Sequence, residues 1–360
     1  MHRMLSRSLA LALVLILGFA VVYALWEPAR RSPLPAHAYD HNAVWARYQW
    51  FSGVRGHFDR MTSPYAGGAP QVETSEIDTF AAILRENRIH DVYIFTGSLN
   101  RDGRYPLWPL EDARAPKVLP KTFALLRERV PGIRLLAWVG GVHAGFRRGQ
   151  MDLRQHDVRA ATAELCARLT TEAGFDGVHL NIEPTRNNDD AYVELLADVR
   201  ARLPRGKVLS VAAPRVFSRV PPFRPFRNHF WDLAYTARVA ARVDQLAFMT
   251  YDTFMPFPKI HRAFLRYETK AIVRAVRMGN PHAEVLLGVP TYDDHNISHV
   301  RNVETISNTL RGIRAGLNDL RNDATPFSGV AIYASWTTDA DEWSIYRALW
   351  LGQGDGVAGR

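Results

Sequence analysis

The sequence predicts an α/β protein built as a (β/α)8 TIM barrel, and a repeating pattern is the main reason. Eight short apolar or β-branched runs occur along the chain, and each is followed by a polar loop and a helical pattern. Eight such units over about 320 residues fit a barrel, whose usual size is ~250 residues before insertions. A doubly wound open sheet is the main alternative, but no Gly-x-Gly-x-x-Gly follows the first run to support it.

Polar, charged and aromatic residues occur at the carboxyl ends of the predicted strands. They are, in order, "AVWARY" at about 44–48, 90–97, 133–141, 174–184, 207–214, 243–252, 283–293 and 327–336. In a barrel of this kind the catalytic groups sit where the strands end. The residues found at these ends are Gly140-Gly141, Asn181, Glu183, Arg215, Tyr251-Asp252, Tyr292-Asp293-Asp294 and Tyr333 through Trp336.

The fourth run, "GFDGVHLNIEP" at 174–184, separates into two faces. Val178, Leu180 and Ile182 alternate with polar residues at 179, 181 and 183. Strand side chains alternate sides with a period of two, so one face is apolar and the other polar. We expect the apolar face to pack on the surrounding helices and the polar face to point into the mouth of the barrel, with residue 183 nearest the substrate.

The amino terminus predicts export. A basic start precedes 19 residues without a charge, 8–26, close to the ~20 needed to span a bilayer as a helix. The small-residue sequence 22–24 would suit cleavage, whereas the long apolar run suits an uncleaved anchor, so 1–26 is either a signal peptide or a transmembrane signal anchor. Residues 27–38 are Pro-rich and form a linker, and 39–360 form the barrel domain, facing the periplasm or secreted.

The composition excludes some classes of protein. Hydrophobic residues make up 47% and charged residues 22%, as in globular chains with a sizeable core. The net charge of +9 comes from 40 Arg and 5 Lys, scattered rather than clustered, which argues against a nucleic-acid partner and is compatible with an anionic glycan. The single cysteine, Cys166, lies in an apolar helical pattern and is expected in the core.

Four stretches together resemble glycoside hydrolase family 18, the chitinases and related β-N-acetylglucosaminidases. "FDGVHLNIEP" at 175–184 resembles the Asp-x-x-Asp-x-Asp-x-Glu pattern of the fourth strand. "LLAWVGG" at 135–141 resembles the Ser-x-Gly-Gly stretch of the third, with Trp138 or a neighbour at the serine position. "FMTYD" at 248–252 matches Met-x-Tyr-Asp, and "GVPTYDD" at 288–294 resembles Gly-x-Pro-x-Tyr.

The resemblance implies a substrate-assisted retaining mechanism without a cofactor or metal. Glu183 would protonate the glycosidic oxygen while the 2-acetamido oxygen of the sugar attacks the anomeric carbon. Tyr251 would donate its hydroxyl proton to the acetamido oxygen, and Asp252 would position the sugar. Asp176 matches the first aspartate of the pattern, so the expected catalytic set is Glu183, Asn181, Tyr251 and Asp176. The expected substrate-binding residues are Asp252, His179, Trp138, Arg215, Tyr292, Asp293, Tyr333 and Trp336.

Two positions depart from the family pattern. His179 stands at the second aspartate and Asn181 at the third, which normally holds the acetamido N–H. An asparagine supplies no negative charge, but its carbonyl accepts an N–H. The Asn-x-Glu arrangement is similar to that of glycoside hydrolase family 85, the endo-β-N-acetylglucosaminidases, so the change leaves catalysis open and makes chitin a less certain substrate.

Each of the main candidates also has a structural interpretation. Glu183 could pair with an arginine inside the barrel, and Arg215 could pair with a carboxylate rather than bind a charged glycan. His179 could be a buried histidine satisfied by hydrogen bonds. Tyr333 and Trp336 are either the apolar floor beneath a sugar or ordinary barrel packing.

Two polar loops suggest further roles. Residues 186–192, "RNNDDAY", could line a sugar cleft but read more simply as a helix N-cap. Asp293, Asp294, His295 and His299 could in principle ligate a divalent ion, but their spacing fits no closed site. We therefore expect no metal, and contacts to substrate instead.

The sequence leaves three functions open. The first is an exported glycoside hydrolase acting on a glycan with β-linked N-acetylhexosamine. The second is a non-catalytic, chitinase-like carbohydrate-binding protein, which would have no use for the acid. The third is a hydrolase of another envelope polysaccharide, since fold and function are not tied. In each case the partner is a glycan, and any membrane contact is confined to the N-terminal segment.

Overall fold

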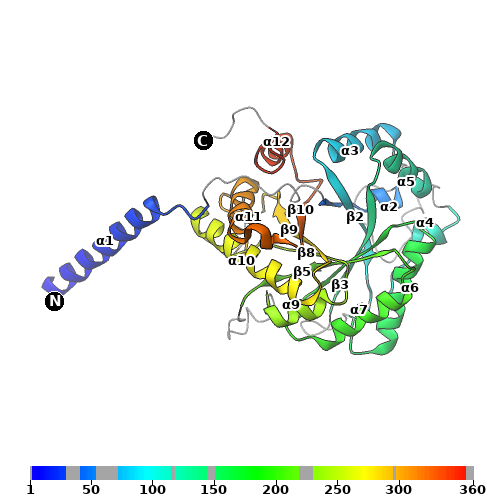
Figure 1. Cartoon of the computed structure of the whole chain (residues 1–360), viewed down its shortest axis with the longest axis horizontal. Coiled ribbons are helices and arrows are strands. Elements are labelled where there is room, and N and C mark those ends of the chain that lie inside the picture. The colour runs from blue at the N-terminus through cyan, green and yellow to red at the C-terminus, as the bar shows by residue number, and fades with distance from the viewer. Residues whose placement is uncertain are drawn as a thin grey trace.

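A closed barrel of eight parallel strands forms the centre of the molecule (Figure 1). The computed structural model describes residues 2–29, 41–53, 72–114, 118–143, 151–218, 230–294 and 297–353. The strand order around the barrel is β1-β10-β9-β8-β5-β4-β3-β2, so the first and last strands pair and close it. The (β/α)8 prediction is confirmed, and the open doubly wound sheet is wrong.

All eight predicted runs are strands of the barrel. They are β1 (Asn42–Ala46), β2 (Ile89–Ser98), β3 (Arg134–Val142), β4 (Gly177–Glu183), β5 (Val208–Ala213), β8 (Gln245–Phe248), β9 (Glu284–Pro290) and β10 (Phe327–Tyr333). Two short strands, β6 (Arg215–Val216) and β7 (Phe230–Trp231), pair with each other outside the barrel. Strand β6 begins two residues after the end of β5 and therefore lies beside its carboxyl end.

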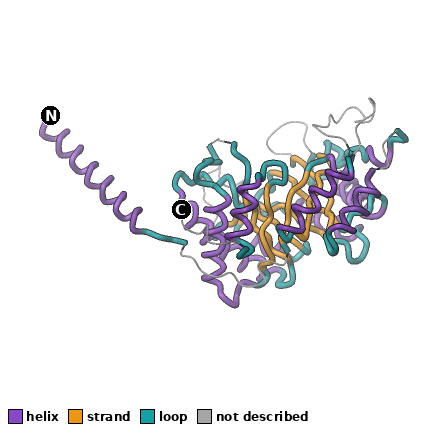
Figure 2. The backbone as a smooth tube through the Cα atoms, turned by 90° about the horizontal axis from the view of Figure 1, so that it is seen from above, coloured by secondary structure: helices purple, strands orange, loops and turns teal. Residues whose placement is uncertain are grey.

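Helices surround the strands (Figure 2). Those of the described chain are α1 (His2–Leu25), α2 (Gln49–Ser52), α3 (Thr74–Glu86), α4 (Trp108–Glu111), α5 (Val118–Arg129), α6 (His156–Thr171), α7 (Asp190–Arg202), α9 (Leu233–Ala240), α10 (Pro258–Gly279), α11 (Ile306–Leu320), the 3-10 turn η2 (Arg321–Ala324) and α12 (Ala340–Leu349). The expected N-cap is present, since the Asp189 side chain accepts from the Tyr192 backbone N–H at the start of α7. Cys166 is buried in α6, as expected.

The strands divide the core into two layers. In β1, Val44 and Ala46 face the helices, while Ala43 and Trp45 belong to a separate apolar cluster inside the barrel. This alternation follows from the period of two in a strand, and helices on the outside leave few strand positions exposed. Apolar surface is buried on both sides of the strands, and each Å² removed from water contributes about 25 cal/mol to the stability of the barrel.

The amino ends of the strands are tied by a buried ionic network. Arg134 at the start of β3 donates two 2.7 Å hydrogen bonds to Asp91 and also contacts Glu284 of β9. Burial raises the pKa of Asp91, but His90 and Arg134 outweigh it and lower that pKa to about 2. Charged groups at this end of a TIM barrel serve stability, whereas chemistry is found at the opposite end.

The N-terminal apolar segment forms helix α1, which extends away from the barrel (Figures 1 and 2). Among the described residues, no helix combines the length and the apolarity that a bilayer-spanning segment needs. The C-terminal end of α1 contacts the beginning of α10: the Tyr23 hydroxyl accepts from the Lys259 backbone N–H at 3.2 Å, and the Phe19 and Phe257 rings lie 6.2 Å apart.

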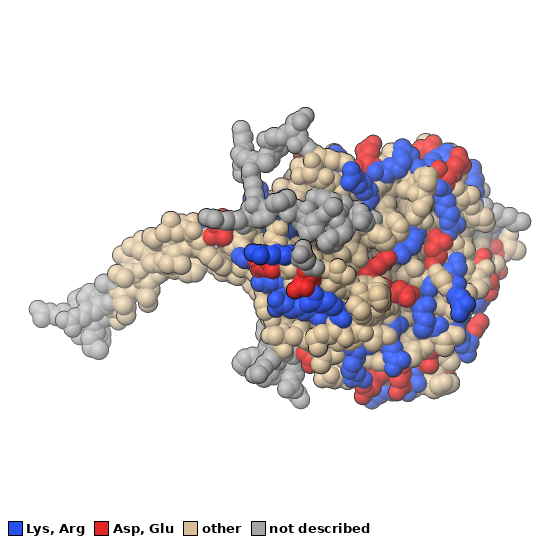
Figure 3. Space-filling view, viewed as in Figure 1, with Lys and Arg blue, Asp and Glu red and all other residues tan. Residues whose placement is uncertain are grey.

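Positive and negative side chains are interspersed on the face of the barrel shown in Figure 3. On this face the positive side chains are not gathered into one stripe. Arginines of the described chain also form ion pairs: Arg168, for example, donates to Glu172 one helical turn away and to Glu111 of α4.

Candidate active site

A cavity of about 860 Å³ opens at the carboxyl ends of the barrel strands. Its walls come from the ends of β3, β4 and β10 and from the loops after β5, β8 and β9. The lining residues are Val142, Asn181, Glu183, Pro184, Thr185, Ala212, Pro214, Arg215, Met249, Tyr251, Asp252, Phe254, Tyr292, Asp294, Ser298, Tyr333, Trp336 and Thr337. Eight of the predicted site residues meet in this one cavity, although they are spread over 156 positions of the chain, from 181 to 336.

Strand β4 delivers Asn181 and Glu183 to the cavity. Val178, Leu180 and Ile182 are at most 1% exposed and pack in the outer core layer, so the residues between them face inward. Glu183 is solvent-exposed at the cavity wall, yet many protein atoms surround its carboxyl group. This desolvation, followed by the negative charge of Asp252, raises the pKa of Glu183. A proton donor near neutral pH requires a raised pKa of this kind.

The side chain of Asn181 has an unused acceptor. Its Oδ1 atom is buried and has no hydrogen-bond partner among the described residues. An unsatisfied buried amide oxygen costs free energy, on the order of 1–3 kcal/mol, unless a ligand satisfies it.

Four aromatic side chains form the opposite side of the cavity. The Tyr251 ring stacks on that of Tyr333 with a centroid distance of 5.4 Å, and Tyr292 meets both edge-on. The Trp336 ring contacts Tyr333 at 5.8 Å. Burial raises the pKa of the Tyr251 hydroxyl well above its ordinary value, so this group remains a hydrogen-bond donor.

The position of the Tyr251 ring requires a glycine at residue 288. A Cβ at Gly288 in β9 would lie 2.8 Å from the Tyr251 Cε1 atom and 2.8 Å from the Phe248 carbonyl oxygen. Both distances are too short for any side chain, so the absence of a Cβ allows the tyrosine ring to lie against the strand.

The loop after β8 presents Asp252 and Phe254 to the cavity in an uncommon backbone conformation. Their φ angles are +54° and +60°, in the left-handed region that non-glycine residues seldom adopt. The segment after β9 holds this loop: Ser298 accepts from the Phe254 N–H at 2.9 Å, and Glu304 accepts from both the N–H and the hydroxyl of Thr253 at 2.8 Å.

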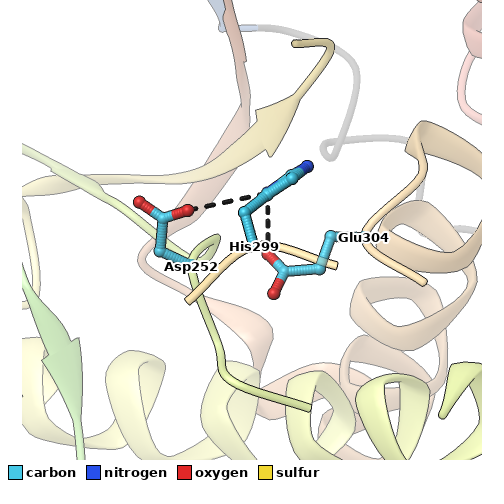
Figure 4. A group of neighbouring side chains, drawn as sticks. All are labelled: Asp252, His299 and Glu304. Carbon is cyan, nitrogen blue, oxygen red and sulfur yellow. Dashed lines mark ion pairs between the residues drawn. The ribbon is translucent and has the colours of Figure 1, made fainter. Parts of the chain in front are cut away.

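A histidine lies between two carboxylates where the segment after β9 contacts the loop after β8 (Figure 4). The His299 Nδ1 atom is 3.6 Å from Asp252 and 3.4 Å from Glu304. Burial lowers the pKa of His299, but the two carboxylates outweigh it and raise that pKa to about 9, so the imidazole is charged at neutral pH. Burial raises the pKa of Asp252, but the neighbouring His299 and the hydrogen bond from Tyr292 outweigh it, and the net shift is downward.

Asp252, His299 and Glu304 also offer three potential metal-ligand atoms within 4.8 Å of one another. A metal-binding histidine must be neutral, whereas the contacts here favour the imidazolium, so these residues fit an ion-paired group better than a metal centre. Of the four residues considered from the sequence, only His299 belongs to this group, and His295 lies outside the described residues.

Comparison with known proteins identifies the family of the chain. Residues 73–346 match the profile of the family described as Glycosyl hydrolases family 18. The chain belongs to glycosyl hydrolase family 18. A search of curated protein sequences finds no match.

Solved structures related to this family 18 chain share its fold. A chitinase from Bacteroides thetaiotaomicron aligns with a TM-score of 0.56 at 11% identity, over 88% of this chain and 99% of the other. A class V chitinase from Pseudomonas fluorescens gives 0.52 at 14% identity, over 86% and 99%. The spore cortex-lytic enzyme SleL of Bacillus cereus gives 0.51 at 12% identity, over 85% and 73%.

The structure moves Asp176 out of the predicted catalytic set. It precedes β4 at the amino end of the barrel, where its side chain accepts from the Leu135 N–H at 2.9 Å and from Arg127 at 3.0 Å. Glu183 lies at the other end of the same strand, six rises of ~3.3 Å beyond its first residue. In this family 18 chain the first aspartate of the motif therefore joins two elements and does not line the cavity.

Three predicted substrate-binding residues also do not line the cavity. His179 is fully buried, with Trp45 Nε1 donating to its Nε2 at 3.2 Å and Ser210 Oγ 2.8 Å from its Nδ1, and burial lowers its pKa to about 3. Trp138 is 9% exposed, and its ring lies edge-on to that of Tyr333 with a centroid distance of 6.4 Å. The Asp293 side chain is 77% exposed and pairs with Arg301. The structural interpretation of His179 is thus the one that its contacts support.

Sequence reasoning also missed several participants. Phe254 and Ser298 line the cavity, and Glu304 fixes the loop that carries Asp252. For the loop that carries His299 the sequence predicts contacts to substrate, not an ion pair with Asp252 and Glu304. The signal for these roles is a left-handed backbone and a contact between two loops, neither of which a one-dimensional pattern shows.

Proposed function

We propose that this family 18 chain is a glycoside hydrolase that cleaves glycans containing β-linked N-acetylhexosamine, with the substrate's own 2-acetamido group as nucleophile. The observation that carries the proposal is that Glu183, a carboxyl with a raised pKa, shares one cavity with the Asn181 amide oxygen, which has no hydrogen-bond partner among the described residues. Family membership and the chitinases among the structural neighbours support the choice of substrate class.

Glu183 is the proposed general acid. It would hold a proton because it is desolvated and lies near the negative charge of Asp252. Protonation of the glycosidic oxygen lets the leaving group depart as an alcohol, while the acetamido oxygen bonds to the anomeric carbon and gives an oxazolinium intermediate. The resulting Glu183 carboxylate then takes a proton from water, which opens that intermediate with overall retention.

Asn181 and Tyr251 are the proposed partners of the acetamido group. Asn181 Oδ1 would accept the acetamido N–H, which satisfies the buried oxygen that the protein leaves open. Tyr251 would donate to the acetamido oxygen, since its raised pKa keeps the hydroxyl protonated. The rings of Tyr333 and Trp336 offer an apolar platform for the face of the sugar.

Replacement of the acid is the direct test. Glu183→Gln keeps the shape and removes the titrating proton, so turnover of a chromogenic N-acetylglucosaminide or chitooligosaccharide should fall by ~10²-fold or more while glycan binding persists. Glu164→Gln, an exposed glutamate of α6, is the matched control and should retain activity. Unchanged turnover in Glu183→Gln would mean that Glu183 is structural.

Asn181 tests whether the acetamido group is the nucleophile. A thiazoline mimic of the intermediate should inhibit, because such analogues bind ~10²-fold or more tighter than substrate in a site built for them. Asn181→Ala should lose that inhibition together with activity, whereas Asn181→Asp should keep part of both. Cleavage of a glycan without acetamido groups, unaffected by the thiazoline, would exclude substrate assistance.

Asn181 at the family's third aspartate also keeps a second function in view, a carbohydrate-binding protein without catalysis. It shares the cavity and the aromatic platform but makes no use of a proton donor. Binding of chitooligosaccharides by the wild type, with no released product after prolonged incubation, would favour this function over hydrolysis. Release of products from another envelope polysaccharide alone would instead keep the enzyme and change its substrate.

Export of the barrel is part of the proposal. The support is the basic start of the chain followed by 19 uncharged residues. Fractionation of cells that express the full chain, with sequencing of the mature N-terminus, distinguishes a cleaved form from one that keeps α1. Recovery of an uncleaved protein solely from the cytosol would contradict export.

A further inference from the structure

A buried arginine in the wall of the cavity forms no ion pair with an acidic residue of the described chain. Arg215 is the first residue of β6, directly after the end of β5, and is 6% exposed. It lines the cavity together with Tyr251, Asp252 and Phe254. Its position is therefore beside the residues proposed to hold the sugar, not at the remote rim.

Aromatic rings and one carbonyl group hold the guanidinium. Its Cζ atom lies 4.8 Å from the ring centroid of Phe230, its pairing partner in β7, and 5.5 Å from that of Phe254. Nη1 donates to the Tyr251 carbonyl oxygen at 3.2 Å. A guanidinium carries five N–H donors, so most of its hydrogen-bonding capacity is not used by these contacts.

No carboxylate neutralises this charge at close range. Within the described chain no Asp or Glu oxygen lies within 4.0 Å of Arg215. By sequence, the undescribed segments that follow β3, β6 and β9 (144–150, 219–229 and 295–296) contain no Asp or Glu. By contrast, Arg134 and Arg159, which are also largely buried, each contact two carboxylates.

The acidic groups whose charges act on Arg215 are Glu268, Asp252 and Glu304, and each has other contacts. Asp252 accepts from Tyr292 and pairs with His299, and Glu304 accepts from Thr253. Glu268 is fully buried and accepts from the Val216 backbone N–H at 3.0 Å. Burial raises its pKa to about 8 against the opposing effect of the Arg215 charge, and it forms no ion pair with the guanidinium. Burial likewise lowers the pKa of Arg215, but a guanidinium stays protonated at any working pH.

We propose that Arg215 binds a carboxylate carried by the glycan, so that the substrate is an acidic amino-sugar polymer rather than neutral chitin. This inference rests on the proposed function, since it names the substrate class of the same cavity. A planar guanidinium pairs with a carboxylate through two parallel hydrogen bonds, and such a pair is strong where water is largely excluded. A buried positive charge without a partner is costly, and an anionic sugar would satisfy it.

The experiment measures binding rather than turnover, in the Glu183→Gln background. Three tetrasaccharides serve as probes: chitotetraose, an analogue with 3-O-lactyl carboxylates on alternate sugars, and the methyl ester of that analogue. Calorimetry should give a dissociation constant ~10-fold or more lower for the acid than for its ester, the scale of a charge-assisted hydrogen bond. The preference should weaken at high salt.

Variants of Arg215 then assign the preference. Arg215→Gln should bring the ratio of acid to ester affinity to about one, whereas Arg215→Lys should retain part of it because the charge remains. Arg301→Gln is the matched control: it removes one positive charge from the exposed pair with Asp293, outside the cavity, and should keep the ratio. Circular dichroism of each variant verifies folding.

Several outcomes would overturn the inference. Equal binding of acid and ester by the Glu183→Gln protein would do so, as would an Arg215→Gln protein that keeps the ratio, or tighter binding of a sulfated analogue than of the carboxylate. The outcome for the proposed function is separate, because it depends on turnover by the wild type. A preference for the acid without turnover would leave this inference standing and remove the hydrolase.

Discussion

Replacement of His299 by glutamine should remove a pH-dependent part of the stability. His299 is 1% exposed and lies between Asp252 and the fully buried side chain of Glu304, and their charges raise its pKa from 6.5 to about 9. A difference of about 2.5 pKa units between the folded and unfolded chain corresponds to about 3 kcal/mol. His299→Gln keeps a polar side chain of similar reach but carries no charge.

The sign follows from the direction of the shift. Because the folded pKa is raised, the stabilisation is fully present below the unfolded pKa of 6.5 and is lost as the pH rises through about 9. The difference in unfolding free energy between wild type and His299→Gln should therefore be larger at about pH 6 than at about pH 10, by about 3 kcal/mol. Any constant cost of leaving Glu304 without its partner adds equally at both ends.

Urea unfolding followed by tryptophan fluorescence, at several pH values between these limits, measures the difference. His282→Gln is the control, since His282 is an exposed histidine before β9 and its loss should change the pH dependence little. A difference between wild type and His299→Gln that is the same at every pH would refute the ion-paired imidazolium. The contacts that hold the loop of Asp252 would then depend on packing rather than on charge.

Three further predictions concern the catalytic end and its opposite. Asp176→Asn should lower stability by ~1 kcal/mol without changing kcat, because its bonds join elements at the amino end; a fall in kcat in a protein of unchanged stability would return it to the catalytic set. In pH profiles of kcat/KM, the alkaline limb assigned to Glu183 should lie above the ordinary glutamate range. It should move to lower pH in Asp252→Asn, because that variant removes a negative charge that raises the pKa of Glu183. A limb that stays in place would show that another group titrates. Gly288→Ala should reduce activity strongly while the barrel folds, because its Cβ would displace the Tyr251 ring; full activity with an unperturbed near-UV spectrum would contradict that role.

The barrel could be predicted from the sequence because its signals are local. The alternation of Val178, Leu180 and Ile182 with polar residues is a property of one strand, and a strand of period two allows only one inward face. The topology then fixes that Asn181 and Glu183 end at the mouth, and the same rule applied to each strand brought Tyr251 and Tyr333 to the cavity.

The tertiary structure decided which polar residues are chemically available. His179 and Asn181 share a face and differ by two positions, but one is enclosed by Trp45 and Ser210 while the other opens to the cavity. Depth along the strand, and the size of the side chains on neighbouring strands, set this difference, and neither is written in the local pattern.

The fate of the charges was likewise decided only in three dimensions. Asp176 and Asp252 are both motif aspartates by sequence, yet one accepts from a backbone N–H at the amino end and the other pairs with His299 at the cavity. The sequence by itself determined the eight units, the polar face of the fourth strand and the acid at its end, because each depends on neighbours along the chain. Whether Arg215 meets a carboxylate depends on residues far from it in the chain. Only packing could show that it instead contacts the Tyr251 carbonyl group and the rings of Phe230 and Phe254, which are 15 to 39 positions away.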